Sequence, residues 1–345
     1  MEDTQPVEEI NEIKGLFFMP QTAQQQKFSD VDNHAGLQFN YYDPAKHSDE
    51  NLNYKFLLPA LESIKGSDFD FVLGFDHGLQ RMIIGYPHPD GKFLVFNAHQ
   101  QAAMLAHYFL RTNQNEADRL VVKGLVLSQQ IDKIITKNGG IYRESHAGYD
   151  HLKEVISSVD QEVVFLAFDE KNHVMMNLES GENIKEILRF FIEMMAGLKA
   201  QKKGLYDYHV DIQVRYKLYA EKTFNISSEG ENKKIFDRFR LHPPSDAMHE
   251  ELVSISDFKK RLFSNKLTGR KSEIELEQMD MVQLEYSSGL KITVEMTDEG
   301  SKLFLHLSDY TDCYNKESFP EARKNIHDRL LKVVVSLGKM VINVN

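Results

Sequence analysis

Residues 120–168 decide the fold class, and their sequence is LVVKGLVLSQQIDKIITKNGGIYRESHAGYDHLKEVISSVDQEVVFLAF. Apolar residues predict strands that begin near residues 120, 141 and 163, and two segments of helical periodicity separate these strands. The helical segments repeat apolar residues at intervals of three and four positions: Ile131, Ile134 and Ile135 in the first, and Leu152, Val155 and Ile156 in the second. Strands that alternate with helices in this way predict an α/β layered domain with a mixed or parallel sheet.

The same pattern continues on both sides of this stretch. Three short apolar runs between residues 71 and 96 predict strands, and a helical pattern follows at 102–109. On the other side, apolar residues hold helical spacing over three turns at 184–195. We therefore assign residues 51–205 to one α/β domain.

The two ends of the chain have different patterns. Residues 1–50 show no sustained period, apart from a short helical face formed by Val7, Ile10 and Ile13, and we interpret them as an N-terminal extension or a remnant of another domain. Residues 206–345 contain apolar alternation at 290–294 and 303–307 and a final amphipathic helix. This grouping predicts a linker and a smaller α+β C-terminal domain.

Composition excludes several classes of function. The 345 residues carry a formal net charge of −11, which argues against a nucleic-acid or anionic-membrane partner. The single cysteine, Cys313, excludes an intramolecular disulfide framework. No apolar run approaches the ~20 residues that span a bilayer, and the acidic first residues do not resemble a signal peptide. We expect a cytoplasmic protein.

Polar residues that follow predicted strands are the candidate site residues. Asp169 and Glu170 follow one strand, at the sheet edge where α/β proteins bind ligands, and could accept hydrogen bonds from sugar hydroxyls. The alternative is a solvated turn. Asp76 and Arg81 follow another strand, with a surface turn and a local ion pair as the alternative. The spacing of His146, Asp150 and His151 could suit a metal ion. We interpret them instead as polar residues of a surface loop, because the sequence supplies no further ligand.

The order of these segments resembles the phosphohexomutases, the family of phosphoglucomutases and phosphomannomutases. Residues 71–82, FVLGFDHGLQRM, are similar to the strand and D-x-D-x-D-R metal loop of that family. The motif SHAGYDH at 145–151 stands where the family has its sugar-discriminating T-x-T-G-F-K loop, and FLAFDE at 165–170 resembles the sugar-binding F-G-F-E-E-S segment. Residues 235–244, IFDRFRLHPP, are similar to the entry into the last domain. The resemblance covers residues 50–345.

The resemblance implies a site of which only part is kept. Asp76 and Arg81 match the metal loop, but Gly78 and Gln80 replace two aspartates, so a magnesium ion would find a poor set of ligands. We expect no cofactor, and magnesium only if this reduced loop still binds it.

The sugar and phosphate loops are altered as well. Gly148 and Tyr149 match the sugar-discriminating loop, although Asp150 replaces its basic residue, and Asp169 and Glu170 match the acid pair. Ser308 is the clear match to the phosphate-binding R-P-S-G-T-E-P loop, whose arginine is replaced by histidine. These residues are the ligand-binding candidates: Asp169, Glu170, Gly148, Tyr149, Arg81 and Ser308, with Asp76 as a doubtful metal ligand.

The resemblance also implies a chain that keeps only the tail of the second mutase domain, the third and the fourth. The family's phosphoserine loop, T-A-S-H-N-P, does not occur in this sequence, so we assign no catalytic residue. Our leading hypothesis is a catalytically silent mutase-like protein that binds a protein partner, a second copy of itself, or a sugar or sugar phosphate. The alternative is an intramolecular phosphotransferase of carbohydrate metabolism whose serine domain comes from another chain.

Overall fold

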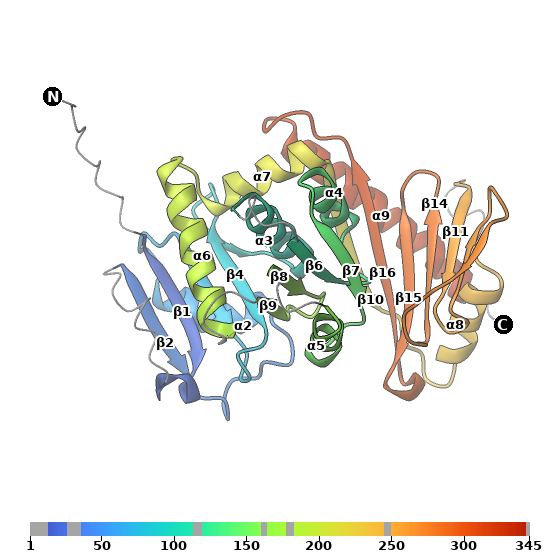
Figure 1. Cartoon of the computed structure of the whole chain (residues 1–345), viewed down its shortest axis with the longest axis horizontal. Coiled ribbons are helices and arrows are strands. Elements are labelled where there is room, and N and C mark those ends of the chain that lie inside the picture. Colours follow the sequence, from blue (N-terminus) through green and yellow to red (C-terminus); the bar gives the residue numbers. More distant parts are fainter. Residues whose placement is uncertain are drawn as a thin grey trace. The chain divides into compact units, whose positions relative to one another are not determined.

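The structure is a computed structural model (Figure 1) that describes residues 13–25, 36–112, 119–159, 164–176, 183–244 and 250–342. The chain divides into two compact units. Unit 1 comprises residues 1–127 and 131–212, and unit 2 comprises residues 128–130 and 213–345.

The first sheet of unit 1 has the strand order β2-β1-β3-β4-β5 and is blue to cyan in Figure 1. Its strands are β1 (Gly15–Pro20), β2 (Leu37–Tyr42), β3 (Phe71–Phe75), β4 (Met82–Pro87) and β5 (Phe93–Val95), and a short 3₁₀ helix, η1 (Gln21–Gln25), follows β1. Strand β1 runs parallel to both β2 and β3, whereas β4 is antiparallel to its neighbours β3 and β5. Continuous burial of β1, β3 and most of β4 matches their unbroken apolar sequences.

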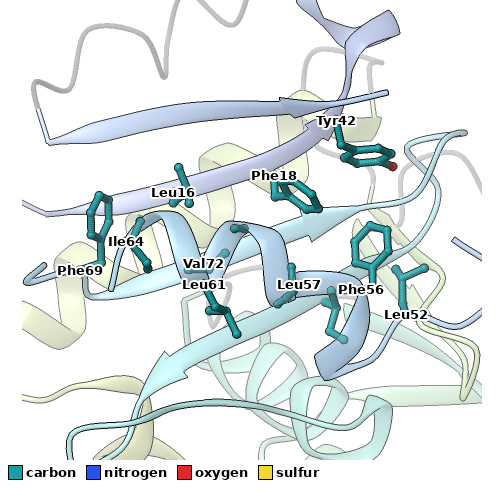
Figure 2. Close-up of a cluster of buried hydrophobic side chains, with 12 residues drawn as sticks. Leu16, Phe18, Tyr42, Leu52, Phe56, Leu57, Leu61, Ile64, Phe69 and Val72 are labelled. Atoms are coloured by element: carbon teal, nitrogen blue, oxygen red, sulfur yellow. The ribbon is translucent and has the colours of Figure 1, made fainter. Parts of the chain in front are cut away.

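Helix α2 (Tyr54–Ser63) covers one face of this sheet. Asn53 begins the helix, because its side-chain oxygen accepts a hydrogen bond from the Lys55 N–H at 2.8 Å. Figure 2 shows the helix turning its apolar side chains toward the strands, and the buried cluster consists of Leu16, Phe18, Tyr42, Leu52, Phe56, Leu57, Ala60, Leu61, Ile64, Phe69, Val72 and Ile83. A Cβ at Gly74 would lie 2.4 Å from Leu57 Cδ2, so the close approach of α2 requires glycine there.

The second sheet of unit 1 repeats the topology of the first, with the order β7-β6-β8-β9. Its strands are β6 (Arg119–Gly124), β7 (Ile141–Ser145), β8 (Val164–Phe168) and β9 (Val174–Met176). In both sheets the first strand lies between two parallel neighbours, and the fourth strand runs antiparallel beside the third. Unit 1 therefore contains the same four-strand arrangement twice.

Besides α2, the described residues form five further helices in unit 1 or at its limits along the chain. They are α3 (Ala98–Thr112), α4 (Gln129–Lys137), α5 (Tyr149–Ser157), α6 (Asn183–Ala200) and α7 (Leu205–Tyr216). Helix α5 packs on the second sheet through the buried side chain of Leu152. Helix α3 contacts β4 of the first sheet and β8 of the second, and α6 reaches the first sheet through a ring contact of Phe191 with Phe71 at 4.9 Å.

Unit 2 contains a seven-stranded antiparallel sheet with the order β10-β16-β15-β14-β11-β12-β13, which is yellow to red in Figure 1. Its elements are β10 (Leu218–Asn225), α8 (Asn232–Leu241), β11 (Leu252–Asp257), β12 (Leu262–Asn265), β13 (Lys271–Glu273), β14 (Met281–Tyr286), β15 (Lys291–Thr297), η3 (Asp298–Gly300), β16 (Lys302–Thr311) and α9 (Phe319–Ile342). Helix α9 packs against β10 and β16, and α8 packs against β15 and β16. Apolar residues at every second position of β16, Leu303, Leu305 and Leu307, are buried.

The predicted fold class is confirmed: mixed α/β sheets precede a C-terminal α+β unit. The domain limits at residues 1–50, 51–205 and 206–345 stay a prediction, although strands from both sides of residue 50 share the first sheet. Ile13 is buried next to β1, whereas Val7 and Ile10 lie outside the described residues. Within the described ranges, no helix is both long and apolar enough to cross a membrane.

Candidate functional site

The turn between β3 and β4 is organised by Asp76. Its Oδ1 accepts hydrogen bonds from the N–H groups of Gln80 at 2.8 Å and Arg81 at 2.9 Å, and its Oδ2 accepts one from Arg81 Nε at 2.9 Å. Leu79 adopts the left-handed conformation, with φ 54°, and its N–H donates to the Asp76 carbonyl. Both carboxylate oxygens of Asp76 therefore face donors of its own turn.

The turn between β8 and β9 has the same construction around Asp169. Oδ1 accepts from the N–H groups of Lys171 at 2.9 Å and His173 at 3.0 Å, and Oδ2 accepts from His173 Nδ1 at 2.8 Å and from the Gly148 N–H at 2.7 Å. The residue three positions after the aspartate, Asn172, is again left-handed, with φ 70°. A carboxylate offers about four lone-pair sites, so these four donors saturate Asp169.

The two turns lie side by side and join the two sheets of unit 1. Arg81 and His173 form an antiparallel β-bridge, with the Met82 N–H donating to the Asn172 carbonyl at 2.9 Å. Gln101 on α3 fastens the pair, because its Nε2 donates both to Asn172 Oδ1 at 2.7 Å and to the Met82 carbonyl at 2.9 Å. We call the turns 76–81 and 169–173 together the paired turns.

Gly148, Tyr149 and Glu170 gather around the second of these turns. Gly148 has φ 134°, a conformation that favours glycine, and it immediately precedes α5. The ring of Tyr149 lies 6.2 Å from the ring of His173, and burial, followed by the charge of Asp150, raises the pKa of Tyr149.

Glu170 lies against the end of β6. A Cβ on Gly124 would approach Glu170 Oε2 to 2.4 Å, so a larger residue at this position would displace the Glu170 carboxylate. The structure thus brings Gly148, Tyr149, Asp169 and Glu170 together at one sheet edge, and the β-bridge adds Asp76 and Arg81. The ligand-binding role of each residue stays a prediction.

The geometry at Asp76 does not fit the magnesium ion that the family resemblance implies. Mg²⁺ needs near-octahedral oxygen ligands, whereas three donors occupy the Asp76 oxygens. In the described part of the chain, no three His, Cys, Asp or Glu side chains are grouped so that they could hold a metal ion, and this includes the neighbouring rings of His146 and His151.

Ser308 belongs to unit 2 and lies within strand β16 instead of a loop. It pairs with Glu221 on β10 and with Lys291 on β15, and all three are buried. Burial raises the pKa of Glu221 to about 7, against an opposing hydrogen bond from Ser128. Neither Glu221 Oε1 nor Ser308 Oγ has a hydrogen-bond partner among the residues that the structure describes.

Four residues with a part in the paired turns were not predicted from the sequence. Asp49 accepts from the His77 N–H at 2.9 Å and lies 3.3 Å from Arg81 Nη2. The others are His173, Asn172 and Gln101. Asn172 could have been predicted as a turn residue, because asparagine tolerates the left-handed conformation that a tight turn requires.

The doubled α/β topology and the antiparallel α+β unit resemble the fold of solved phosphohexomutases. The crystal structure of parafusin, a phosphoglucomutase and exocytosis-sensitive phosphoprotein of Paramecium, matches 87% of this chain with a TM-score of 0.56 at 13% identity, and the match covers 52% of parafusin. A phosphoglucomutase/phosphomannomutase family protein of Burkholderia thailandensis matches 95% of the chain with a TM-score of 0.52 at 12% identity, covering 62% of that protein.

The relatives found by sequence comparison are also phosphoglucomutases. The phosphoglucomutase of Staphylococcus aureus is 22% identical over 299 residues, which cover 81% of this chain and 54% of the relative. That of Staphylococcus epidermidis is 20% identical over 264 residues, which cover 74% of this chain and 48% of the relative. The chain thus spans about half the length of these relatives. No protein-family model matches it.

Proposed function

We propose that this chain is a catalytically silent, phosphohexomutase-like protein that acts by binding. The observation that carries the proposal is the saturation of Asp169, whose two oxygens accept four hydrogen bonds from within unit 1. An acid in this state has no lone pair left for a sugar hydroxyl, so its contribution is to hold the turn.

The altered loops support the same proposal. Gly78 and Gln80 stand where the family has two metal-binding aspartates, and Asp150 stands where it has a basic residue. A carboxylate at that position would repel a phosphate group. The apolar strands that build the sheets are kept, which is the pattern expected when a scaffold persists after its old site has lost its chemistry.

The proposed ligand is a protein, including a full-length mutase or a second copy of this chain, or a sugar or sugar phosphate held near Tyr149 and Glu170. The net charge of −11 favours a basic surface on a protein partner. We propose that the protein works in the cytoplasm.

A second candidate function is an intramolecular phosphotransferase whose serine domain is supplied by another chain. The observation in its favour is that Gly148, Tyr149 and Glu170 still lie together at one sheet edge. In that case Glu170, rather than the saturated Asp169, would accept the sugar hydroxyls.

A mutase assay combined with thermal shift separates these candidates. Glucose 1-phosphate, glucose 6-phosphate and mannose 6-phosphate are added with and without magnesium, and the Tm and the interconversion of the phosphates are measured. The proposal predicts no interconversion, because no phosphoserine loop is present in this chain. Turnover by the purified chain alone would contradict it. A Tm increase without turnover would identify the sugar phosphate as the bound ligand.

A further inference from the structure

Three side chains on neighbouring strands of unit 2 form a hydrogen-bonded chain. Thr223 Oγ1 on β10 lies 2.9 Å from His306 Nδ1 on β16, and His306 Nε2 lies 3.2 Å from Glu295 Oε2 on β15. A neutral histidine has one N–H and one lone pair, and a carboxylate can only accept a hydrogen bond. The tautomer that satisfies all three groups carries its proton on Nε2, so the Thr223 hydroxyl donates to Nδ1.

The register of the sheet explains why the hydroxyl and the imidazole meet. Thr223 and His306 lie directly opposite each other in the antiparallel pair of β10 and β16. The Ile226 N–H donates to the Leu303 carbonyl at 2.8 Å, so these two residues form a hydrogen-bonded pair of the same register. Because the two kinds of pair alternate along an antiparallel ladder, Thr223 and His306 form a non-hydrogen-bonded pair, in which side chains lie closest together.

The Thr223 hydroxyl is accessible at the edge of the sheet. Strand β10 is an edge strand, and the N–H of a residue in a non-hydrogen-bonded pair points away from the partner strand. The Tyr219 N–H, four residues earlier, points outward in this way and donates to Gln213 Oε1 at 3.1 Å. Thr223 is exposed, whereas the side chains of His306 and Glu295 are only 11% and 10% exposed. A reagent can therefore reach the hydroxyl while the imidazole and the carboxylate stay fixed behind it.

This arrangement suits the transfer of an acyl group to the hydroxyl. A hydroxyl bonded to an imidazole, which is bonded in turn to a carboxylate, is the arrangement that activates a hydroxyl as a nucleophile. Both distances fall within the range of about 2.6–3.2 Å over which a general base removes a proton. The outward N–H of Thr223 is a donor for the negative charge that develops on an attacked carbonyl oxygen.

The surroundings favour an uncharged acyl donor. Glu221 lies two positions before Thr223 on the same face of β10, and when charged it would, together with Glu295, repel an anionic donor such as an acyl phosphate. The ring of Phe304 lies 6.2 Å from the ring of His306 and adds an apolar surface beside the imidazole. A small neutral ester therefore fits this edge of the sheet better than a phosphorylated compound.

We propose that Thr223 is an acylation site, at which an activated carboxylic ester transfers its acyl group to Oγ1. His306 Nδ1 takes the hydroxyl proton as the bond between Oγ1 and the acyl carbon forms. The bond between that carbon and the leaving oxygen then breaks, and His306 gives the proton to the leaving alcohol. Glu295 is a positioning residue that holds the imidazole. This site goes beyond the proposed function, because it uses no residue of the paired turns and a single acylation needs no turnover.

The test uses p-nitrophenyl acetate, a small uncharged ester, with the purified full chain. The release of nitrophenol is followed over time, and the acetylated residues are located by peptide mass spectrometry. We expect a rapid release of one equivalent of nitrophenol per chain and an acetyl group on Thr223. Thr268 is the internal control, because it is an exposed threonine in the turn between β12 and β13 whose Oγ1 accepts a hydrogen bond from the Arg270 N–H. It should stay unmodified.

Substitutions separate the roles of the three side chains. Thr223→Ala should abolish the rapid release, and Thr223→Ser, which keeps a hydroxyl, should retain it. His306→Ala should slow acetylation of Thr223 by about 10²–10⁴-fold, the usual contribution of a general base. Glu295→Gln should lower the limiting rate about tenfold at an unchanged half-saturating ester concentration, because Glu295 does not touch the ester. Far-UV circular dichroism verifies that each variant is folded, and His306→Gln replaces His306→Ala if the latter does not fold.

Two results would overturn the proposal. One is acetylation of Thr223 that is no faster than acetylation of Thr268, since the hydroxyl would then behave as an ordinary surface threonine. The other is acetylation of Thr223 at the wild-type rate in a folded His306 variant, since the imidazole would then have no part in the reaction. Neither result bears on mutase turnover, so the proposed function is tested separately.

Discussion

Two buried carboxylates of unit 1, Asp76 and Asp169, have different surroundings from two of unit 2, Glu221 and Asp309. In unit 1, Asp76 accepts three hydrogen bonds and Asp169 accepts four, all from nearby donors. In unit 2, burial raises the pKa of Glu221 to about 7 and that of Asp309 to about 6, although Arg329 lies 3.0 Å from Asp309 and opposes the shift. Asp76 and Asp169 are thus surrounded by hydrogen-bond donors, whereas burial dominates the surroundings of Glu221 and Asp309.

This difference separates two uses of a buried acid. A carboxylate that is surrounded by N–H donors stabilises its turn and has little capacity left for a ligand. A carboxylate that is buried with few donors destabilises the fold when it is charged, and natural proteins keep such groups where they serve a purpose. Asp76 and Asp169, which match the mutase loops, are of the first kind, and Glu221 is of the second kind.

The largest effect is expected from Asp169→Ala, which removes the acceptor of four hydrogen bonds and leaves buried donors without a partner. We expect a loss of about 4 kcal/mol in the free energy of unfolding. Urea unfolding followed by far-UV circular dichroism measures it. The matched control is Asp150→Ala, at an exposed carboxylate in the first turn of α5, which should cost less than about 1 kcal/mol. Equal effects of the two substitutions would contradict a structural role for Asp169.

Glu221→Gln tests a buried acid of unit 2. We expect it to stabilise the protein, whereas Asp169→Ala destabilises it. The folded pKa of Glu221 is raised from 4.5 to about 7, so the folded state binds more protons than the unfolded state between these values. The contribution of Glu221 to the free energy of unfolding therefore falls by about 3 kcal/mol in total as the pH rises from about 4.5 to 7.

Glutamine stays neutral at every pH, so it should remove the loss of stability that the charged Glu221 causes as the pH rises. We expect Glu221→Gln to stabilise the protein by about 2–3 kcal/mol at pH 8 and to change little at pH 4.5. Unfolding free energies at the two pH values measure the difference. A variant that is less stable than the wild type at pH 8 would show that the anion of Glu221 has a stabilising partner after all.

An intermediate effect is expected at the contact that fastens the paired turns. Gln101→Ala and Asn172→Ala each remove the hydrogen bond between these side chains, so their effects should not add. A double-mutant cycle should give a coupling energy of about 1 kcal/mol. Additive losses would show that the two side chains stabilise the turns separately.

The smallest effect compares the paired turns with each other. Leu79 and Asn172 occupy the same left-handed position, three residues after the aspartate, but leucine is strained there. Leu79→Asn gives the first turn the residue type of the second and should stabilise the protein by about 0.5–1 kcal/mol. A destabilised variant would mean that packing of the half-buried Leu79 side chain outweighs the relief of strain.

Much of the fold could be predicted from the sequence because strands with both faces buried are unbroken apolar runs. Strands β3, β4 and β8 have such runs, β6 has one that Lys123 interrupts, and all four strands were expected. Strand β2, with the sequence LQFNYY, is only partly buried. Its first five residues alternate apolar and polar side chains, which is a strand signal that the prediction overlooked. Its neighbour β1 is apolar throughout, but its pairing with β3 is set by residues more than fifty positions away.

The candidate site was predictable in position but not in its bonding. Asp169 follows a buried strand, and this placed it at the sheet edge. The direction in which its carboxylate faces depends on Gly148, which lies 21 residues earlier and meets Asp169 only in the folded chain. The same holds for Arg81, whose acceptors at residues 49 and 50 lie more than thirty positions away.

The most direct test of the account is calorimetric titration of magnesium chloride into the purified chain, because the central claim is that internal donors occupy the acids of the paired turns. We expect heats equal to those of dilution. A saturable isotherm that is lost in Asp76→Asn or Asp169→Asn would contradict it, since a carboxylate of these turns would then be open to a metal ion.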